Sequence, residues 1–98
     1  MHRVVFAPEA NQQLVELYRY VALRGSAAVA TSFTNAIVEY CERLSRFPRR
    51  GTKRDDIRPG LRTVGFRRRV TIAFTVDDTT VTILGVFYGG RDFENSLR

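Results

Sequence analysis

The chain has 98 residues, a formal net charge of +6 and an apolar fraction of 44%. A chain of this length builds a single hydrophobic core, so we expect one domain over residues 1–98, and its apolar and aromatic content excludes a disordered protein. One cysteine, and no apolar run near the roughly 20 residues that span a bilayer, indicate a cytoplasmic protein without disulfides or membrane segments.

The first predicted elements are a short strand and a long helix. Residues 4–6 are β-branched or aromatic, and Pro8 biases the residue before it towards extended backbone. Pro8 itself suits the first turn of a helix. Gly25 is expected to end that helix. Between the two, apolar residues recur at the spacing of one helical stripe: Ala10, Leu14, Leu17, Tyr18 and Val21.

A second helix is predicted directly after the first. Ser26 is a favourable N-cap residue, and Pro48 cannot lie inside a helix. The apolar stripe between them comprises Ala30, Phe33, Ile37, Tyr40, Cys41 and Leu44. Because the link around Gly25 is short, the two helices are predicted to form an antiparallel hairpin, with apolar faces that need a sheet to cover.

The second half of the chain is predicted to form three antiparallel strands. Residues 61–66, 70–76 and 80–87 are rich in β-branched and aromatic residues. Asp77 and Asp78 fit a tight turn between the last two strands. In the middle strand Val70, Ile72, Phe74 and Val76 alternate with smaller residues, which indicates one strongly apolar face.

The remaining segments show no periodicity. Residues 48–60 combine proline, glycine and charge and are predicted to be a loop, and no structure is predicted for the polar tail 89–98. The chain is therefore predicted to be an α+β domain of order β-α-α-β-β-β. Its N-terminal strand is followed by a two-helix antiparallel hairpin packed on a C-terminal antiparallel sheet.

Positive charge is concentrated in one segment. Eleven arginine or lysine residues and two aspartates lie between Arg43 and Arg69, a net charge of +9, whereas the rest of the chain has a net charge of −3. Clustered like charge is typical of a surface that binds a polyanion or an acidic protein. A solvated loop that aids solubility is the alternative.

Several short motifs accompany this order of elements. They are Ala7-Pro8-Glu9-Ala10 before the first helix, Phe47-Pro48-Arg49-Arg50-Gly51 after the second, Ile57-Arg58-Pro59-Gly60-Leu61-Arg62 before the middle strands, and Ile83-Leu84-Gly85-Val86-Phe87-Tyr88-Gly89-Gly90-Arg91-Asp92 at the close. No single motif is diagnostic. Their joint order and spacing, which cover nearly the whole chain, resemble the RelE/ParE superfamily of bacterial type II toxins, and in particular its ParE-like branch.

The resemblance implies a toxin that a cognate antitoxin protein neutralises, and it leaves two modes of action open. RelE-like members cut ribosome-bound mRNA, whereas ParE-like members are associated with inhibition of DNA gyrase. RNase members have an arginine in the strand corresponding to residues 70–76, where this chain has Thr71. Tyr88 replaces the histidine of many ParE-like members, and a catalytic tyrosine occurs near the end of RNase toxins. We expect DNA gyrase to be the target, with mRNA cleavage as the alternative.

The scarcity of groups that titrate near neutral pH favours a protein that acts by binding. RNA cleavage without a metal needs groups that move protons and cations that stabilise the charge on the phosphate. His2 is the only histidine and lies near a terminus, and a tyrosine in water ionises only at about pH 10. For the RNase alternative alone, the candidate catalytic residues are Arg62, Tyr88 and Arg91.

The candidate binding residues are Arg62, Arg67, Arg68, Arg69 and Arg91. The resemblance places the residue corresponding to Arg62 beside the concave face of the sheet. Successive strand residues point in opposite directions, so at least one of the three adjacent arginines is expected to face solvent. No cofactor or metal is expected, since no ligand cluster or glycine-rich phosphate loop is found in the sequence. Direct contact with nucleic acid stays open.

Overall fold

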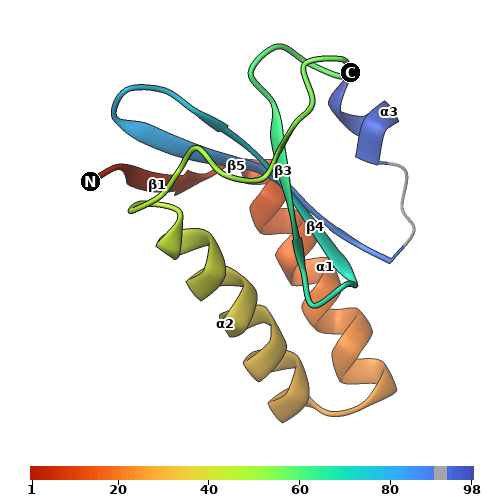
Figure 1. Cartoon of the computed structure of the whole chain (residues 1–98). Coiled ribbons are helices and arrows are strands. Elements are labelled where there is room, and N and C mark those ends of the chain that lie inside the picture. The colour runs from red at the N-terminus through yellow and green to blue at the C-terminus, as the bar shows by residue number, and fades with distance from the viewer. Residues whose placement is uncertain (90–92) are drawn as a thin grey trace.

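The computed structural model describes residues 1–89 and 93–98, and its elements follow the predicted order with two additions (Figure 1). The elements are β1 Arg3–Phe6, α1 Pro8–Arg24, α2 Ala27–Arg43, β2 Thr52–Lys53, β3 Arg62–Phe66, β4 Val70–Val76, β5 Thr80–Tyr88 and α3 Phe93–Leu97. The additions are β2 and α3, which lie in the segments predicted to be a loop and an unstructured tail.

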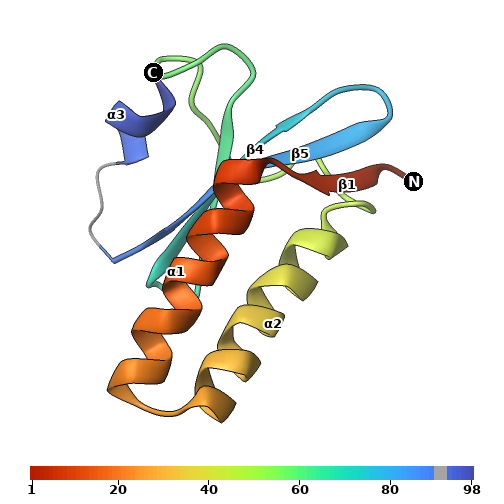
Figure 2. The same cartoon turned by 180° about the vertical axis from the view of Figure 1, so that it is seen from behind.

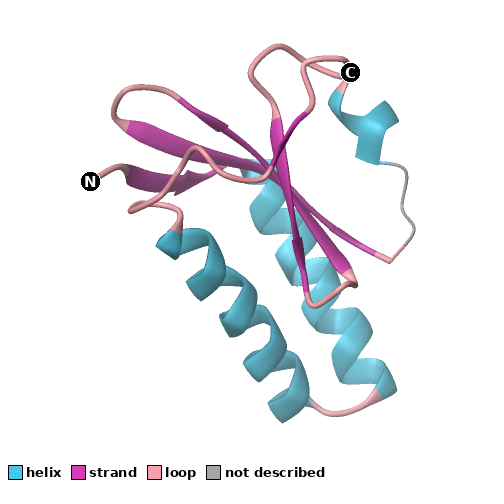
Figure 3. Cartoon of the chain, viewed as in Figure 1, coloured by secondary structure: helices cyan, strands magenta, loops and turns pink. Residues whose placement is uncertain are grey.

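The strands form one five-stranded sheet in the order β1-β5-β4-β3-β2 (Figure 3). The pairs β2–β3, β3–β4 and β4–β5 are antiparallel, as expected for the C-terminal strands. β1 adds to the edge next to β5 in parallel orientation, so the sheet as a whole is mixed. The N-terminal strand thus belongs to the same sheet as the C-terminal ones.

The starts of both long helices and the end of α1 have the causes that the sequence suggests, whereas the end of α2 does not. Pro8 opens α1, and the N–H of Gly25 donates to the Val21 carbonyl as that helix ends. The Ser26 hydroxyl accepts a hydrogen bond of 3.1 Å from the Val29 N–H, which satisfies one of the free donors at the start of α2. α2 ends at Arg43, before Pro48, so the proline does not end it; residues 44–46 form a turn in which each N–H donates to the carbonyl three residues earlier.

Both long helices cover the same face of the sheet, as the views from opposite sides show (Figures 1 and 2). The predicted stripes meet the sheet there, with Leu17 from α1 and Ile37 and Cys41 from α2 among the buried residues. Ile72 and Phe74 of β4 are fully buried against them. The alternation in the middle strand therefore predicted the buried face correctly.

A smaller cluster covers the other face of the sheet. It consists of Ile57, Leu61, Ala73, Phe87 and Leu97, with Leu84 and Phe93 packed against it. α3 and the connection between β2 and β3 supply this cover, and Arg54 joins them through an ion pair of 3.6 Å with Glu94. No helix in residues 1–89 or 93–98 is long and apolar enough to cross a membrane.

The β4–β5 turn is closed by Asp77. Its Oδ1 accepts hydrogen bonds from the N–H groups of Thr79 at 2.9 Å and Thr80 at 2.7 Å. These bonds favour the ionised carboxylate and hold the pKa of Asp77 below its usual value of 3.8. The sequence predicted this turn correctly.

Asp77 should make stability depend on pH in acid. A carboxyl group whose folded-state pKa is lowered contributes its full stabilisation above the unfolded pKa and loses it as pH falls through the folded value. Melting temperatures measured from about pH 6 down to about pH 2 should therefore fall less steeply for Asp77→Asn than for the parent. Equal slopes for the two proteins would show that these hydrogen bonds do not favour the charged form.

Candidate functional site

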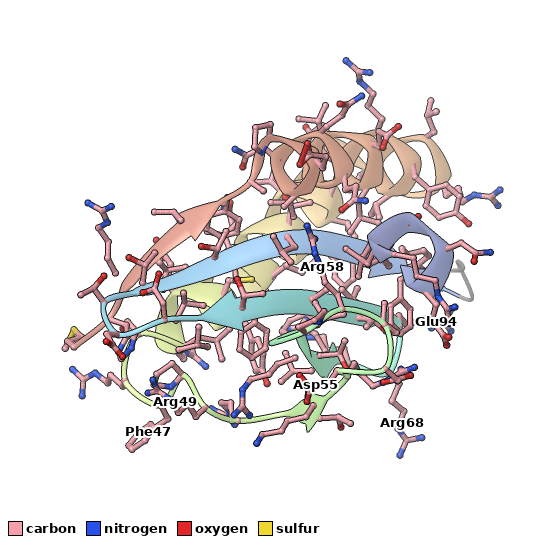
Figure 4. The ribbon with its side chains drawn as sticks, turned by 90° about the horizontal axis from the view of Figure 1, so that it is seen from above. Phe47, Arg49, Asp55, Arg58, Arg68 and Glu94 are labelled. Atoms are coloured by element: carbon pink, nitrogen blue, oxygen red, sulfur yellow. The ribbon has the colours of Figure 1, made fainter. Side chains whose placement is uncertain are left out.

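The basic segment between Arg43 and Arg69 does not form one surface. β3 runs through it, so Arg62 starts that strand and Arg67 follows its last residue. Four strand steps separate Arg62 from Phe66, which is about 13 Å at the usual rise per residue. In Figure 4, Arg49 and Arg68 accordingly lie at opposite ends of the molecule.

The first group of basic residues surrounds the start of β3. Arg49, Lys53 and Arg62 line a hollow of about 210 Å³ together with Asp55. The Arg62 guanidinium donates a long hydrogen bond of 3.4 Å to the carbonyl oxygen of Arg50. Arg62 is half-buried, and its paired neighbour Lys53 lies on the same face of the sheet. This group is a mainly cationic hollow, and its carboxylate, Asp55, accepts a hydrogen bond of 2.8 Å from the Gly60 N–H.

The second group is the tight turn between β3 and β4. Arg67 and Arg68 both have positive φ, at 49° and 63°, and the Arg69 N–H closes the turn by donating to the Phe66 carbonyl. Two left-handed residues are what the type I′ hairpin turn requires, and Asn-Gly is the sequence that favours it. In L-residues other than glycine, asparagine and aspartate this conformation is strained by roughly 1–2 kcal/mol each. All three arginines are exposed.

An unbroken chain of rings connects this turn to the end of α1. The Cζ of Arg67 lies 4.9 Å from the centre of the Phe66 ring, and Phe33 follows at 6.3 Å. Tyr88 lies 6.2 Å from Phe33 at a right angle, and Tyr20 lies 5.5 Å from Tyr88. The chain ends where the Cζ of Arg24 lies 4.6 Å above Tyr20. We call Tyr20, Tyr88, Phe33 and Phe66 the aromatic chain. It links four elements, α1, α2, β3 and β5, with an arginine stacked at each end.

A pocket of about 290 Å³ lies beside the aromatic chain, between α1 and the end of β5. Gln13, Tyr20 and Tyr88 are among the residues that line it. β1 pairs with β5 only as far as Ile83, and beyond it the Gln13 side chain accepts a hydrogen bond of 2.7 Å from the Val86 N–H. Gln13 thus satisfies a donor on the part of β5 that no strand covers.

The candidate catalytic residues are not brought together. Tyr88 is in register with Val70, and Val70 with Phe66, so Tyr88 lies at the opposite end of the sheet from Arg62. Arg91 lies outside the described residues. Thr71 is half-buried between Gly65 and Phe87 on the face away from the helices. Among the described residues, the candidates Arg62 and Tyr88 therefore do not meet in one site.

If the protein is a toxin, as the resemblance implies, Tyr88→Phe is expected to leave the growth arrest that it causes within a few-fold of the parent. Tyr88 contributes a ring to the aromatic chain, and no hydrogen bond to its hydroxyl is found among the described residues. A tyrosine that moves a proton would lose about 10²- to 10⁴-fold on the same change. Arrest measured against expression level distinguishes the two, and a loss of that size would identify Tyr88 as a catalytic residue.

The other titratable candidates have structural roles. The Nε2 atom of His2 lies 2.9 Å from the Asp77 carbonyl oxygen at the far end of the sheet. Cys41 is fully buried, and desolvation raises its pKa to about 12, so it is not a nucleophile in the folded protein. Within the described part of the chain, histidine, cysteine and carboxylate side chains form no group that could hold a metal ion.

The sequence identified the arginines of this region as candidates, but it did not predict the geometry of their turn or the aromatic rings beside them. Neither Arg67 nor Arg68 is a residue that signals positive φ, so composition gives no indication of the turn geometry. Tyr20 lies off the predicted apolar stripe. The one usable signal was the spacing of Tyr20 and Arg24, which are four residues apart and hence neighbours on a helix surface.

Comparison with known proteins identifies the family of the chain and a solved structure with a similar fold. Residues 4–93 match the family described as the ParE toxin of type II toxin-antitoxin system, parDE. Toxin ParE3 of Caulobacter vibrioides is 33% identical over 97 residues, covering 99% of this chain and 96% of that protein. A solved chain of the chromosomal ParDE TA system from P. aeruginosa superposes with a TM-score of 0.79. At 22% identity, covering 91% of this chain and 97% of that one, it is similar in fold.

Proposed function

This chain belongs to the ParE toxin family of type II toxin–antitoxin systems, and we propose that it acts in the cytoplasm by binding and inhibiting DNA gyrase until a cognate antitoxin neutralises it. The observation that carries the proposal is the register of the sheet. It separates Arg62 from Tyr88 along the strands, so the cation and the tyrosine that the RNase alternative would use do not meet in one site.

An apolar groove on the outer side of the helical hairpin suits the antitoxin. It has a volume of about 370 Å³ and is lined by Leu14, Val15, Tyr18, Arg19, Thr34, Asn35 and Val38. Val15, in the middle of α1, is 49% exposed and lies in this groove beside other apolar side chains. An amphipathic helix laid into such a groove is a recurring mode of recognition, and an antitoxin segment of that kind would bury these side chains.

Val15→Glu is expected to weaken antitoxin binding by about tenfold or more and to leave the toxic effect unchanged. The carboxylate would lose its hydration when a partner helix covers the groove, and pairing with the neighbouring Arg19 would offset only part of this loss. Titration calorimetry with the antitoxin measures the loss, and Asn35→Asp on the same groove tests the dependence on position. Unchanged affinity for Val15→Glu would exclude the groove as the antitoxin site.

The mode of action is tested by expressing the free toxin in bacteria that lack the antitoxin. Inhibition of gyrase is expected to stop replication first, so cells should filament and induce a DNA-damage response while bulk mRNA stays intact. An early stop of translation with cleaved transcripts would instead establish an mRNA endonuclease. Co-expression of the antitoxin should abolish either effect.

A further inference from the structure

One end of the molecule combines exposed arginines, exposed apolar side chains and stacked rings. It consists of the β3–β4 turn and the two helix ends that meet at Gly25, joined by the aromatic chain. Its exposed members are Leu23, Arg24, Val29, Arg67, Arg68 and Arg69. We call this region the arginine–aromatic end. In Figure 4, Arg68 points away from the body of the protein into solvent.

We propose that the arginine–aromatic end is the surface through which the toxin binds its target, and that it recognises a protein surface with an apolar centre and an acidic rim. The inference rests on the proposed function in so far as the target is a protein. It goes further by assigning the contact to Arg67 and Arg68, and by separating this surface from the antitoxin groove on the outer side of the hairpin.

The two turn residues Arg67 and Arg68 weaken the fold that contains them. Asn-Gly would close the same hairpin without strain, whereas Arg67 and Arg68 hold positive φ with bulky side chains. No carboxylate among the described residues pairs with either arginine or with Arg69. Three adjacent cations therefore repel one another without compensation inside the described chain. Arg67 gains the stacking contact with Phe66, and a partner that supplies negative charge would relieve the repulsion among the three arginines.

This end is also preorganised for binding. The Arg67 guanidinium is stacked on Phe66, and Phe66 is held by Phe33 and by Tyr40 at 5.4 Å. Stacking fixes the direction in which the planar group presents its N–H donors to a carboxylate. Arg24 is fixed in the same way on Tyr20 at the other end of the chain. These arginine side chains then lose less conformational entropy on binding than free side chains would.

The apolar side chains at this end distinguish a protein partner from a nucleic acid. Leu23 is 87% exposed and Val29 55% exposed, and Val29 lines a shallow hollow together with Arg67 and Phe33. Aliphatic side chains gain nothing from a phosphate backbone, but they form the centre of protein interfaces. Arginine and tyrosine beside them are the residues that carry most binding energy at such interfaces. This composition therefore favours an acidic protein surface.

The test is the double variant Arg67→Asn, Arg68→Gly. It gives the turn its favoured sequence and removes both guanidinium groups, so the melting temperature should rise by about 4–8 °C while target binding is lost. Growth arrest should require at least about tenfold more toxin, and antitoxin affinity should stay at the parental value. The matched control Arg3→Asn, Arg98→Gln removes the same charge elsewhere, since Arg3 pairs with Thr80 at the opposite end of the sheet. It should keep full toxicity.

The outcomes separate this proposal from the proposed function. Undiminished growth arrest by the double variant would overturn the surface assignment, and so would a parallel loss of antitoxin binding. In another outcome, the parent binds duplex DNA in the absence of gyrase while the double variant does not. If the double variant still binds gyrase, that result would overturn the assignment in favour of a nucleic-acid site. If the parent arrests growth without affecting gyrase and the double variant does not arrest it, the surface assignment stands and gyrase is the wrong target.

Discussion

Replacement of Phe74 by alanine is expected to lower the free energy of unfolding by about 3–5 kcal/mol. Phe74 is fully buried at the centre of β4, where the sheet meets both helices. The change removes the apolar area of the ring and leaves a cavity that fixed strands cannot close. Domains of this kind have a total stability of about 5–15 kcal/mol, so the loss is a large part of the whole.

Phe47→Ala is the matched control for this prediction. The same side chain is removed, but Phe47 is 71% exposed and points outward from the loop after α2 (Figure 4). Its effect should stay within about 0.5 kcal/mol. Urea unfolding followed by circular dichroism measures both variants. Equal midpoints for Phe74→Ala and the parent would mean that the core does not lie where the structure places it.

Gly51→Ala is expected to cost about 2–4 kcal/mol, an effect that the residue type alone does not reveal. Gly51 has a φ of +83° directly before β2. A Cβ atom there would collide with the Thr63 carbonyl oxygen and lie 2.6 Å from Cγ1 of Val64. Both atoms belong to β3, a strand held on both sides, so neither moves freely. The Phe47–Gly51 turn therefore needs glycine for two independent reasons.

Gly60→Ala separates those two reasons. Its φ of +81° is nearly the same, but no heavy atom lies within 4 Å of an added Cβ. Only the left-handed conformation is then unfavourable, at roughly 1–2 kcal/mol. Thermal melts of the two variants should differ by the steric part alone. Equal losses would show that β3 yields to the added methyl group.

The elements that the sequence predicted well are those set by local spacing. The apolar stripes of α1 and α2, the Ser26 cap and the Asp77 turn all depend on residues within a few positions of one another. The alternation in residues 70–76 needed only the contrast between two faces of one strand. Signals of this kind can be detected within a short window of the sequence.

The features that escaped prediction depend on contacts between distant residues. The parallel pairing of β1 with β5 joins Arg3 to Thr80, and nothing near either residue encodes it. α3 is only five residues long and is stabilised by packing on the far face of the sheet rather than by its own propensity. The basic segment between Arg43 and Arg69 was predicted to form one surface because it is continuous in sequence. Five extended residues of β3 are enough to divide it between two ends.

The central claim, that this toxin acts by inhibiting gyrase, is tested most directly with purified components. Gyrase, relaxed DNA and ATP are incubated with increasing amounts of toxin, and the supercoiled product is measured. Supercoiling should fall in proportion to added toxin and return when an equimolar amount of antitoxin is added. The claim would be contradicted if supercoiling stayed complete at a large excess of toxin while the same toxin preparation cleaved mRNA on translating ribosomes.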